Sequence, residues 1–446
     1  MSAAASSTSA LWRSGADAVP AGGRYAGAVK GSTRHRVAPP PGIDVADPGF
    51  WRLPEPARLA AFARLRRLDA PAFFPEGPLA ADGRRPGFHA LVRHRDVVAA
   101  SRRPDVFTSG HGVTTPRPAR WARIVLGDSM VNLDDPRHAR LRGIISRAFT
   151  ARVVARSAED ISRTAVAIVD DVSAHRPRDF VTSVATPLPL RVICTMMGIP
   201  PENWPAVLRH LDDASEHTAV RSRRIRLPGQ GLWDVARLHR LVGRVARQRR
   251  RRPTDDLISA LVTADVEGRR LTSRELGSFF SLLLVAGVET TRNAITHGLR
   301  LLTTHPEQRA ILTSDFDRYG DGFVDEVVRY ASPIIQFRRT LARDYELNGH
   351  PLRAGEDVVL FYASANRDEE VFAHPDTFDI TRSPNPHVGF GGGGPHYCLG
   401  ASLARQEMTV LFRELYTRLP EIRSVEPPEL IPSNFDHRVK RLSFTF

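Results

Sequence analysis

The chain has 446 residues, of which 42% are hydrophobic and 25% charged, and its formal net charge at pH 7 is +14. No apolar stretch is long enough to span a bilayer, and two distant cysteines give no disulfide framework, which is consistent with a reducing cytoplasm. Arginine supplies nearly all of the positive charge, but no zinc-finger, RNA-recognition or helix-turn-helix signature accompanies it. We therefore interpret the charge as solvated surface and not as a nucleic-acid interface.

The N-terminal part differs in composition from the rest of the chain. Residues 1–44 are rich in Ala, Ser, Gly, Arg and Pro and lack apolar periodicity, so we expect them to be disordered. No linker follows, and residues 45–446 are predicted to form one large domain. Most periodic segments are helical, which predicts a mainly α fold with small β-sheets. The predicted helices cover residues 55–68, 136–149, 155–173, a run from 205 towards 251 broken near Pro228, and 401–418; strands are predicted at 87–92 (followed by a helix near 96–98), 358–362 and 441–446.

The longest predicted helix lies in the second half of the chain. Thr272 and Glu275 form a capping-box pattern at its start, and it runs to about Thr304, just before Pro306. Roughly thirty helical residues extend about 45 Å, which is far enough to cross the whole domain.

The region around Cys398 is the most informative part of the sequence. Cys398 follows four consecutive glycines and precedes the predicted helix at 401–418, whose start should favour a thiolate over a thiol. The glycines around it, including Gly400, would let a large flat ligand approach the backbone. Such a thiolate is suited to ligate a haem iron, where it favours cleavage of the O–O bond.

Other interpretations of this region must be weighed. A lone cysteine is most often a small buried hydrophobe, and a glycine-rich loop before a helix can bind phosphate. However, no Gly-Lys-Ser/Thr follows, as a Walker loop requires. A structural zinc site needs about four ligands, and the only other cysteine, Cys194, lies in an apolar segment typical of a protein core.

Two further motifs accompany the cysteine loop. They are Ala286-Gly287-Val288-Glu289-Thr290-Thr291 in the long helix and Glu326-Val327-Val328-Arg329 downstream. In order and spacing, the three motifs resemble the cytochrome P-450 family, from about residue 50 to the C-terminus. The resemblance implies a single fold that holds haem b between the long central helix and the cysteine loop, with the iron ligated by Cys398.

The long-helix motif implies oxygen activation. Alone, it is typical of a core helix with a tolerated glycine. Beside a haem, Ala286 and Gly287 are expected to widen the helix and make room for dioxygen. Thr290 and Glu289 match the family's alcohol and acid, which implies that Thr290 hydrogen-bonds dioxygen and that Glu289 relays protons towards it.

The pair of Glu326 and Arg329 has two interpretations. An i,i+3 Glu–Arg pair is usually a surface pair of modest value. The resemblance implies instead a buried pair that supports the haem-binding side. The family's third partner is an arginine just before the phenylalanine of a Pro-x-x-Phe motif, but Thr377 occupies that place here, and Arg382 is a candidate substitute.

Cations for the haem carboxylates are implied at four positions. His138 and Arg142 lie four residues apart and face the same way on one predicted helix. Arg339 has the family's spacing from a downstream aspartate, with Arg338 as a near rival. His396 occupies the family's usual basic position, two residues before the cysteine. Individually, each of these would be an ordinary solvated charge.

The cysteine loop departs from the family in one respect. Its aromatic residue, Phe390, stands eight residues before Cys398, where the family usually has it seven before. With this loop, the chain resembles the actinobacterial branch that oxidises sterol side chains and methyl-branched lipids. The resemblance implies a bulky hydrophobic substrate, which is a terpenoid, a steroid or a branched lipid. Its apolar pocket is expected to include Leu282, Val285, Ala286, Ile334 and Ile335.

The predicted function is therefore that of a haem-thiolate monooxygenase, which activates dioxygen and hydroxylates an unactivated carbon. The chain lacks the cysteines of an iron–sulfur cluster and any nucleotide-binding fingerprint, so electrons are expected from a separate ferredoxin and ferredoxin reductase. Two alternatives are oxidative coupling or desaturation on the same iron, and a non-catalytic haem-binding sensor, against which the Glu289–Thr290 pair argues. An acidic ferredoxin is expected to dock on Arg137, Arg140, Arg405 and Arg413.

Overall fold

The computed structural model describes residues 36–77, 86–117, 129–148, 151–209, 230–254, 256–266 and 269–446. Most of the segment expected to be disordered, residues 1–44, lies outside this part, so the domain boundary stays a prediction. The fold described below is that of Val37–Phe446. Among its described helices, none is long and apolar enough to cross a membrane.

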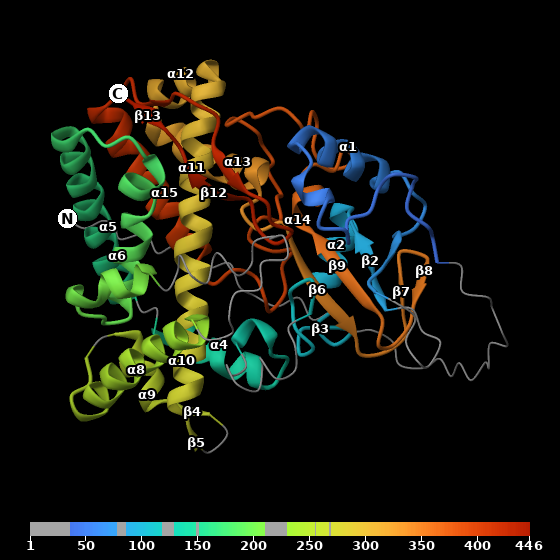
Figure 1. The fold of residues 1–446 in the computed structure, drawn as a ribbon, viewed down its shortest axis with the longest axis horizontal. Coiled ribbons are helices and arrows are strands. Elements are labelled where there is room, and N and C mark those ends of the chain that lie inside the picture. Colours follow the sequence, from blue (N-terminus) through green and yellow to red (C-terminus); the bar gives the residue numbers. More distant parts are fainter. Residues whose placement is uncertain are drawn as a thin grey trace, which may run out of the picture. The chain divides into compact units, whose positions relative to one another are not determined.

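A long helical element, which we call the central helix, organises the fold (Figure 1). It consists of α10 (Ser273–Leu284), a π-helical segment η5 (Val285–Glu289) and α11 (Thr290–Thr304). The predicted capping box of Thr272 and Glu275 is present, and α12 (Pro306–Ser314) begins at the proline expected to stop the helix. The predicted long helix is confirmed, and its π-helical segment coincides with the motif at which widening was expected.

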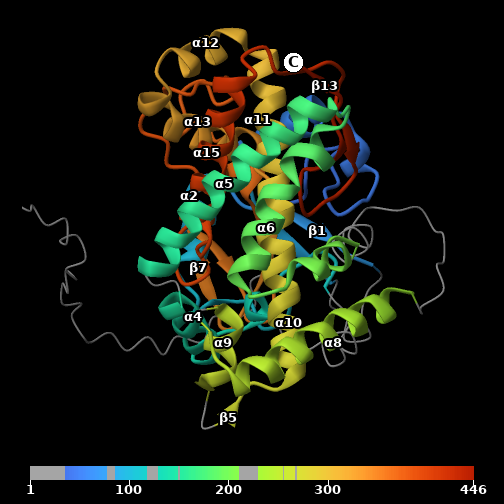
Figure 2. The ribbon, with the colours of Figure 1, turned by 90° about the vertical axis from the view of Figure 1, so that its left-hand side faces the viewer.

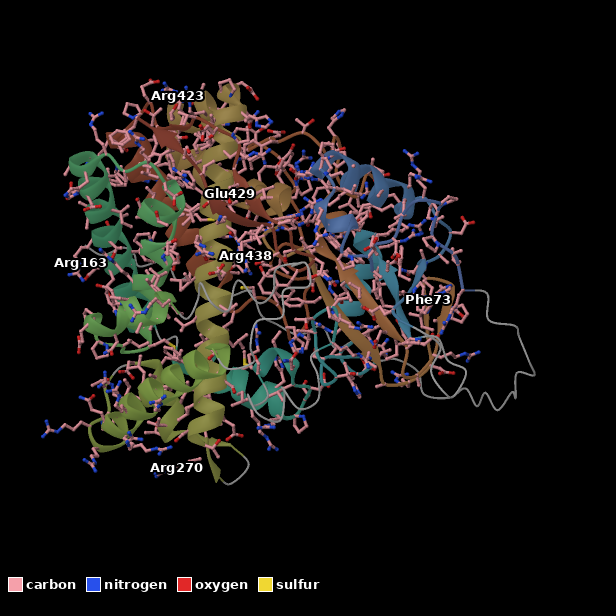
Figure 3. All side chains as sticks on the ribbon, in the orientation of Figure 1. Phe73, Arg163, Arg270, Arg423, Glu429 and Arg438 are labelled. Atoms are coloured by element: carbon pink, nitrogen blue, oxygen red, sulfur yellow. The ribbon has the colours of Figure 1, made fainter. Side chains whose placement is uncertain are left out.

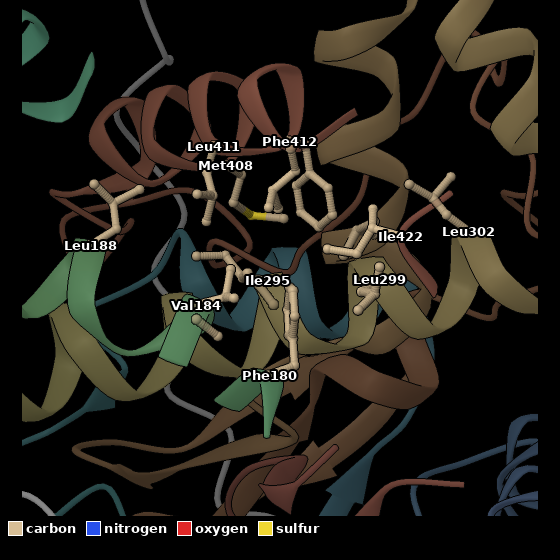
Figure 4. Close-up of a cluster of buried hydrophobic side chains, with 14 of the residues drawn as sticks. Phe180, Val184, Leu188, Ile295, Leu299, Leu302, Met408, Leu411, Phe412 and Ile422 are labelled. Atoms are coloured by element: carbon tan, nitrogen blue, oxygen red, sulfur yellow. The ribbon is translucent and has the colours of Figure 1, made fainter. Parts of the chain in front are cut away.

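A hydrophobic core surrounds α11. The helices α5 (Ala151–His175), α6 (Pro187–Met196), α13 (Phe316–Ala331) and α15 (Ala401–Arg418) pack around it and on one another. Figure 4 shows Ile295 and Leu299 of α11 meeting Met408 and Phe412 of α15, and all four side chains are buried. Because α15 directly follows the cysteine loop, this packing fixes the end of that loop against the central helix.

A second group of helices packs around α10 (Figure 2). It contains α4 (Arg137–Ala148), α8 (Gln230–Arg251) and α9 (Leu257–Thr263), and its buried side chains include Ile145, Val242, Ile258 and Phe280. The predicted helices at 136–149, 155–173 and 401–418 are confirmed. Of the run predicted from 205 towards 251, the part at 210–229 lies outside the described residues.

The largest sheet has five strands in the order β1-β2-β9-β6-β3. Strands β2 and β9 are parallel, and the other neighbours are antiparallel. The sequence predicted β2 and β9 but missed β6, because the burial of Arg338 and Arg339 is invisible in a pattern of apolar residues. The strands are β1 (Phe73–Pro75), β2 (Gly87–Leu91), β3 (Phe107–Thr108), β6 (Gln336–Leu341) and β9 (Asp357–Phe361).

The remaining elements are short. The predicted terminal strand at 441–446 is divided between two separate sheets, β11–β12 and β10–β13, and the predicted helix at 55–68 is α1. The remaining bounds are α1 (Glu55–Arg66), α2 (His94–Ser101), α14 (Tyr362–Ala365), β4 (Asp265–Val266), β5 (Arg269–Arg270), β7 (Tyr345–Leu347), β8 (His350–Leu352), β10 (Arg423–Ser424), β11 (Glu429–Ile431), β12 (Arg438–Arg441) and β13 (Phe444–Thr445).

Candidate active site

The backbone of the cysteine loop is shaped by its glycines. The Cys398 N–H donates to the Phe390 carbonyl oxygen at 2.9 Å, which closes the loop. A Cβ on Gly394 would stand 2.2 Å from the carbonyl oxygen of Ser101, so the loop packs closely against α2 and a side chain cannot be accommodated there. Three glycines have positive φ angles: Gly391 (104°), Gly393 (89°) and Gly394 (75°).

The thiol of Cys398 lies beside open space. Its side chain is exposed, and a Cβ added to Gly400 would meet no atom within 4 Å. Desolvation by the surrounding loop raises the thiol's pKa, against the opposing effects of the Gly400 N–H, Arg142 and Arg405. Gly400 is the N-cap of α15, so Cys398 lies directly before the helix, and the Gly400 N–H lowers the pKa of the thiol, in the direction expected of a helix start. Cys194 is buried, as predicted, and burial raises its pKa to about 12.

The central helix presents accessible residues at its π-helical segment. Ala286 is exposed and Thr290 is half-buried, although they lie in the middle of the longest helical element described. The Thr290 Oγ1 donates to the Ala286 carbonyl oxygen at 2.6 Å. Leu399, next to the cysteine, packs against the same hydrophobic cluster as Val285. These contacts bring the cysteine loop and the π-helical segment to one hydrophobic cluster, and Ala286 and the cysteine both border open space.

Glu289 is held by arginines that sequence reasoning missed. Its carboxylate accepts a hydrogen bond from Arg292 at 2.5 Å, and Arg438 of β12 lies 3.8 Å from the same oxygen. All three side chains are buried. The i,i+3 spacing of Glu289 and Arg292 was a readable signal for the first contact. Nothing local to Arg438 pointed to the second.

The predicted carboxylate-binding residues come together beside the cysteine. The rings of His138 and His396 lie 4.1 Å apart, and Arg142 donates to the Tyr397 carbonyl oxygen at 2.6 Å. Desolvation, followed by the charges of Arg339 and the other cations, holds the pKa of His396 far below its usual value. Ser109, which sequence reasoning missed, hydrogen-bonds the His396 ring at 3.2 Å. Two neutral imidazoles and two arginines are thus gathered at one place.

Arg339, and not its rival Arg338, belongs to this group. Arg338 pairs with Asp357 at 2.7 Å and with Glu76 at 2.6 Å. Arg339 is 5% exposed, donates to the Arg338 carbonyl oxygen at 2.8 Å, and pairs with no carboxylate in the described part of the chain. Because a buried charge needs a partner, an anionic group from a ligand fits next to Arg339.

The Glu326–Arg329 pair is fully buried, and its side-chain oxygens and nitrogens meet twice at 2.7 Å. Arg382 is the third partner, with its Nε 3.3 Å from both carboxylate oxygens. Thr377 contributes only its carbonyl oxygen, which accepts from Arg329 at 3.0 Å. The candidate substitute predicted for the third position is confirmed.

Three of the four arginines expected to bind a ferredoxin are already ion-paired within the chain. The pairs are Arg137–Glu275 (2.7 Å), Arg405–Asp325 (2.7 Å) and Arg413–Asp317 (2.6 Å). A further arginine, Arg102, is exposed and pairs with no described residue. Its Nε would lie 3.1 Å from a Cβ on Gly393 of the cysteine loop.

The expected apolar pocket is accessible in part. Leu282, Val285 and Ile334 are half-buried, and Ala286 is exposed. Ile335, by contrast, is completely buried in the core beside the five-stranded sheet, so its assignment to the pocket is wrong. Side-chain alternation along the chain explains the difference, because neighbouring residues in extended backbone face opposite sides.

Comparison with known proteins identifies the family of this chain. The family model for cytochrome P450 matches residues 237–419. The methyl-branched lipid omega-hydroxylase of Mycobacterium tuberculosis is 44% identical over 433 residues, covering 93% of this chain and 98% of the relative. The chain belongs to the cytochrome P450 family. Its mainly helical fold and its resemblance to lipid and steroid hydroxylases are thereby confirmed.

Other P450s support the same assignment. The steroid C26-monooxygenase of Mycobacterium tuberculosis is 36% identical, covering 90% of this chain and 92% of that relative. The structure of a Mycobacterium marinum cytochrome P450 in complex with pseudoionone has a TM-score of 0.83 and 41% identity, covering 92% of this chain and all of the other. This P450 is accordingly a haem-thiolate monooxygenase.

The residues present fit a haem. An exposed thiol beside open space, in a loop that glycines keep free of Cβ atoms, suits an iron ligand and a flat macrocycle. Arg339, His138, His396 and Arg142 offer the cations and hydrogen-bond donors that haem carboxylates require.

Proposed function

We propose that this P450 hydroxylates an unactivated carbon of a methyl-branched lipid, with Cys398 as the ligand of the haem iron. The observation that carries the substrate class is the 44% identity, over almost the full length of both chains, to an enzyme named for that reaction. The apolar, accessible face of Leu282, Val285 and Ala286 supports it, because a hydrophobic substrate needs such a lining.

Five residues of the cysteine loop and its neighbours would hold the haem. Cys398 would ligate the iron, and Arg339, His396, His138 and Arg142 would bind the carboxylates. Neutral imidazoles donate hydrogen bonds without adding charge, so the arginines supply the positive charge that balances the ligand. When bound, haem supplies dioxygen binding and O–O bond cleavage.

Thr290 and Glu289 deliver the protons that oxygen activation consumes. The Thr290 hydroxyl donates to the Ala286 carbonyl oxygen, so its lone pairs are available to accept a hydrogen bond from water or another proton donor. In this role the hydroxyl fixes the donor beside dioxygen, and Glu289, one residue earlier, replaces the proton that the donor gives up. Both residues thus act on proton supply and not on substrate binding.

Electrons come from separate redox proteins, and we propose an acidic ferredoxin that docks over the cysteine loop. The pairing of Arg137, Arg405 and Arg413 within the chain weakens their attraction for a partner. Arg102 is exposed and its side chain lies over the loop, next to Gly393, so we propose it as a contact for the ferredoxin.

A binding and product screen tests the substrate. Methyl-branched fatty acids, sterols and terpenoids would be titrated against the enzyme, with the spin-state change in the haem spectrum as readout, and products would be identified by mass spectrometry. Tight binding and terminal hydroxylation of the branched acids is the expected result. A preference for sterols or terpenoids, with no product from branched acids, would contradict the proposed substrate while leaving the haem chemistry intact.

A further inference from the structure

Glu289 lies in a buried cluster of charges. Arg292 donates to its carboxylate at 2.5 Å, and Arg438 lies 3.8 Å from the same oxygen. Arg438 in turn pairs with Asp436 at 2.7 Å, and all four side chains are buried. Arg438 thus lies nearer to Asp436 than to Glu289. We call these four residues the Glu289 cluster.

The strand that carries Arg438 is fixed against the central helix. The Val439 N–H donates to Asn293 Oδ1 at 3.2 Å, and Asn293 lies one helical turn after Glu289. Figure 3 shows Arg438 beside α11. The Nδ2 of Asn293 is buried and has no partner in the described part of the chain. Buried donors of this kind are normally satisfied, and a water molecule is the ordinary partner, so a water site next to the cluster is expected.

A cavity lies beside Arg438. It has a volume of about 320 Å³, and its lining combines Arg438, Asp436, His297 and His437 with apolar side chains such as Leu301. Burial lowers the pKa of His297 to about 4 and also lowers that of His437, so both rings are neutral at neutral pH and each can donate and accept a hydrogen bond. Leu53 and Leu430, at 43% and 45% exposed, also line it, so the cavity extends to the surface.

We infer that this cavity admits the water that supplies protons to Glu289, and that Arg438 is the positioning residue between the two. The inference rests on the proposed proton role of Glu289. A carboxylate held by Arg292 from its own helix and, at a longer distance, by Arg438 from β12 can turn between the cavity side and the Thr290 side. The charge of Arg438 draws the carboxylate to the cavity side until it does so.

The chemical balance defines what the cavity must deliver. Hydroxylation takes dioxygen, two electrons and two protons, places one oxygen atom in the new hydroxyl group and releases the other as water. The ferredoxin supplies both electrons. Both protons come from solvent. The inferred path passes them along hydrogen bonds and leaves every cavity residue chemically unchanged at the end of the cycle.

Arg438→Met and Arg438→Lys test the inference. Methionine removes the charge, while lysine keeps it. Positioned proton transfer contributes roughly 10²–10⁴-fold, so Arg438→Met should slow substrate-dependent oxygen consumption at least about tenfold and raise its solvent deuterium isotope effect. Arg438→Lys should recover much of both. Substrate affinity and the carbon monoxide spectrum should be unchanged.

A second readout does not need turnover. Loss of the Arg438 charge leaves Glu289 paired with Arg292, so the infrared carboxylate bands of Glu289 in resting Arg438→Met should shift from their wild-type positions. The shifted bands should vanish in the double variant that also carries Glu289→Gln. His297→Phe, which replaces a polar wall of the cavity, should raise the isotope effect in the same direction and less strongly.

Lys440→Met is the matched control, because Lys440 lies on the same strand but is exposed and pairs with Glu429. It should behave as wild type. Wild-type rates and isotope effects in Arg438→Met, alongside slow Glu289→Gln, would overturn the inference and leave the proposed function standing. Unimpaired Glu289→Gln would instead remove the proton role of Glu289. If Arg438→Met fails to fold, a slow and isotope-sensitive Arg438→Lys supports the inference, and a wild-type Arg438→Lys with wild-type His297→Phe overturns it.

Discussion

Two ion-pair clusters in this P450 share a Glu–Arg–Arg arrangement and have different surroundings. In each, a helix places a glutamate and an arginine three residues apart, and a distant segment adds a second arginine: Arg382 at 3.3 Å in one, Arg438 at 3.8 Å in the other. The first cluster is enclosed by backbone carbonyl groups, which accept from Arg329 and Arg382. The second also contains Asp436 and adjoins the half-buried Thr290 and the cavity beside Arg438.

The difference indicates which buried pairs are structural and which are functional. Arg329 donates to three carbonyl oxygens besides Glu326, so its cluster joins α13 to the segment before the cysteine loop and has nowhere to move. Glu289 has its second arginine at 3.8 Å and a half-buried neighbour, Thr290. We therefore expect the first cluster to give rigidity and the second, if Glu289 has the proposed role, to move protons.

The largest expected effect comes from breaking the enclosed cluster. Glu326→Gln leaves the fully buried Arg329 and the half-buried Arg382 without their carboxylate, and breaking a buried pair costs about 3–5 kcal/mol. Urea unfolding should show that loss, together with poor haem retention. Glu289→Gln should lose less stability, because Asp436 still pairs with Arg438. Equal losses in the two variants would contradict the distinction between the clusters.

Thr290→Ala tests the other side of the comparison. The variant should bind substrate normally and still consume oxygen, because the hydroxyl acts only on proton supply. It should release several times more hydrogen peroxide per product, which a peroxide assay beside product quantification would measure. Unchanged coupling would transfer the role to Thr291 or to water.

A third buried glutamate sharpens the comparison, because no arginine contacts it among the described residues. Burial raises the pKa of Glu407, on α15, to about 8, against roughly 4.3 when unfolded. Between these values the folded chain keeps a proton that the unfolded chain releases, so stability falls as pH rises through this window. Glu407→Gln should remove that fall, by about 1 kcal/mol or more between about pH 5 and pH 8. An identical pH profile in variant and wild type would show that Glu407 is ionised.

The smallest effect is expected at the surface. Arg102→Glu should slow reduction by ferredoxin a few-fold at low salt, with little effect near about 0.5 M, because exposed charges are screened over roughly 10 Å at 0.1 M. Stopped-flow reduction would measure it. Arg413→Glu serves as a comparison, since Arg413 is paired with Asp317, and it should matter less. If neither Arg102→Glu nor Arg413→Glu changes the reduction rate, the ferredoxin docks on another face.

A contact could be predicted from the sequence where its residues lie close together along the chain. Local patterns predicted the central helix, its capping box, α15 and the glycine-rich turn around Cys398. The third partner Arg382 was only a candidate, and Arg438 was missed, because each meets its glutamate across a long stretch of chain. Strand β6 was missed for a related reason: its arginines are buried, and Arg338 pairs with the distant Asp357 of β9 and Glu76.

The identity of the iron ligand is the central claim, and one spectrum tests it most directly. The reduced carbon monoxide complex of the wild type and of Cys194→Ala should both show the thiolate-type band, because Cys194 is buried in the core. Cys398→Ala should lose that band while remaining folded. A thiolate-type spectrum that survives Cys398→Ala, or a wild type that takes up no haem, would contradict the account.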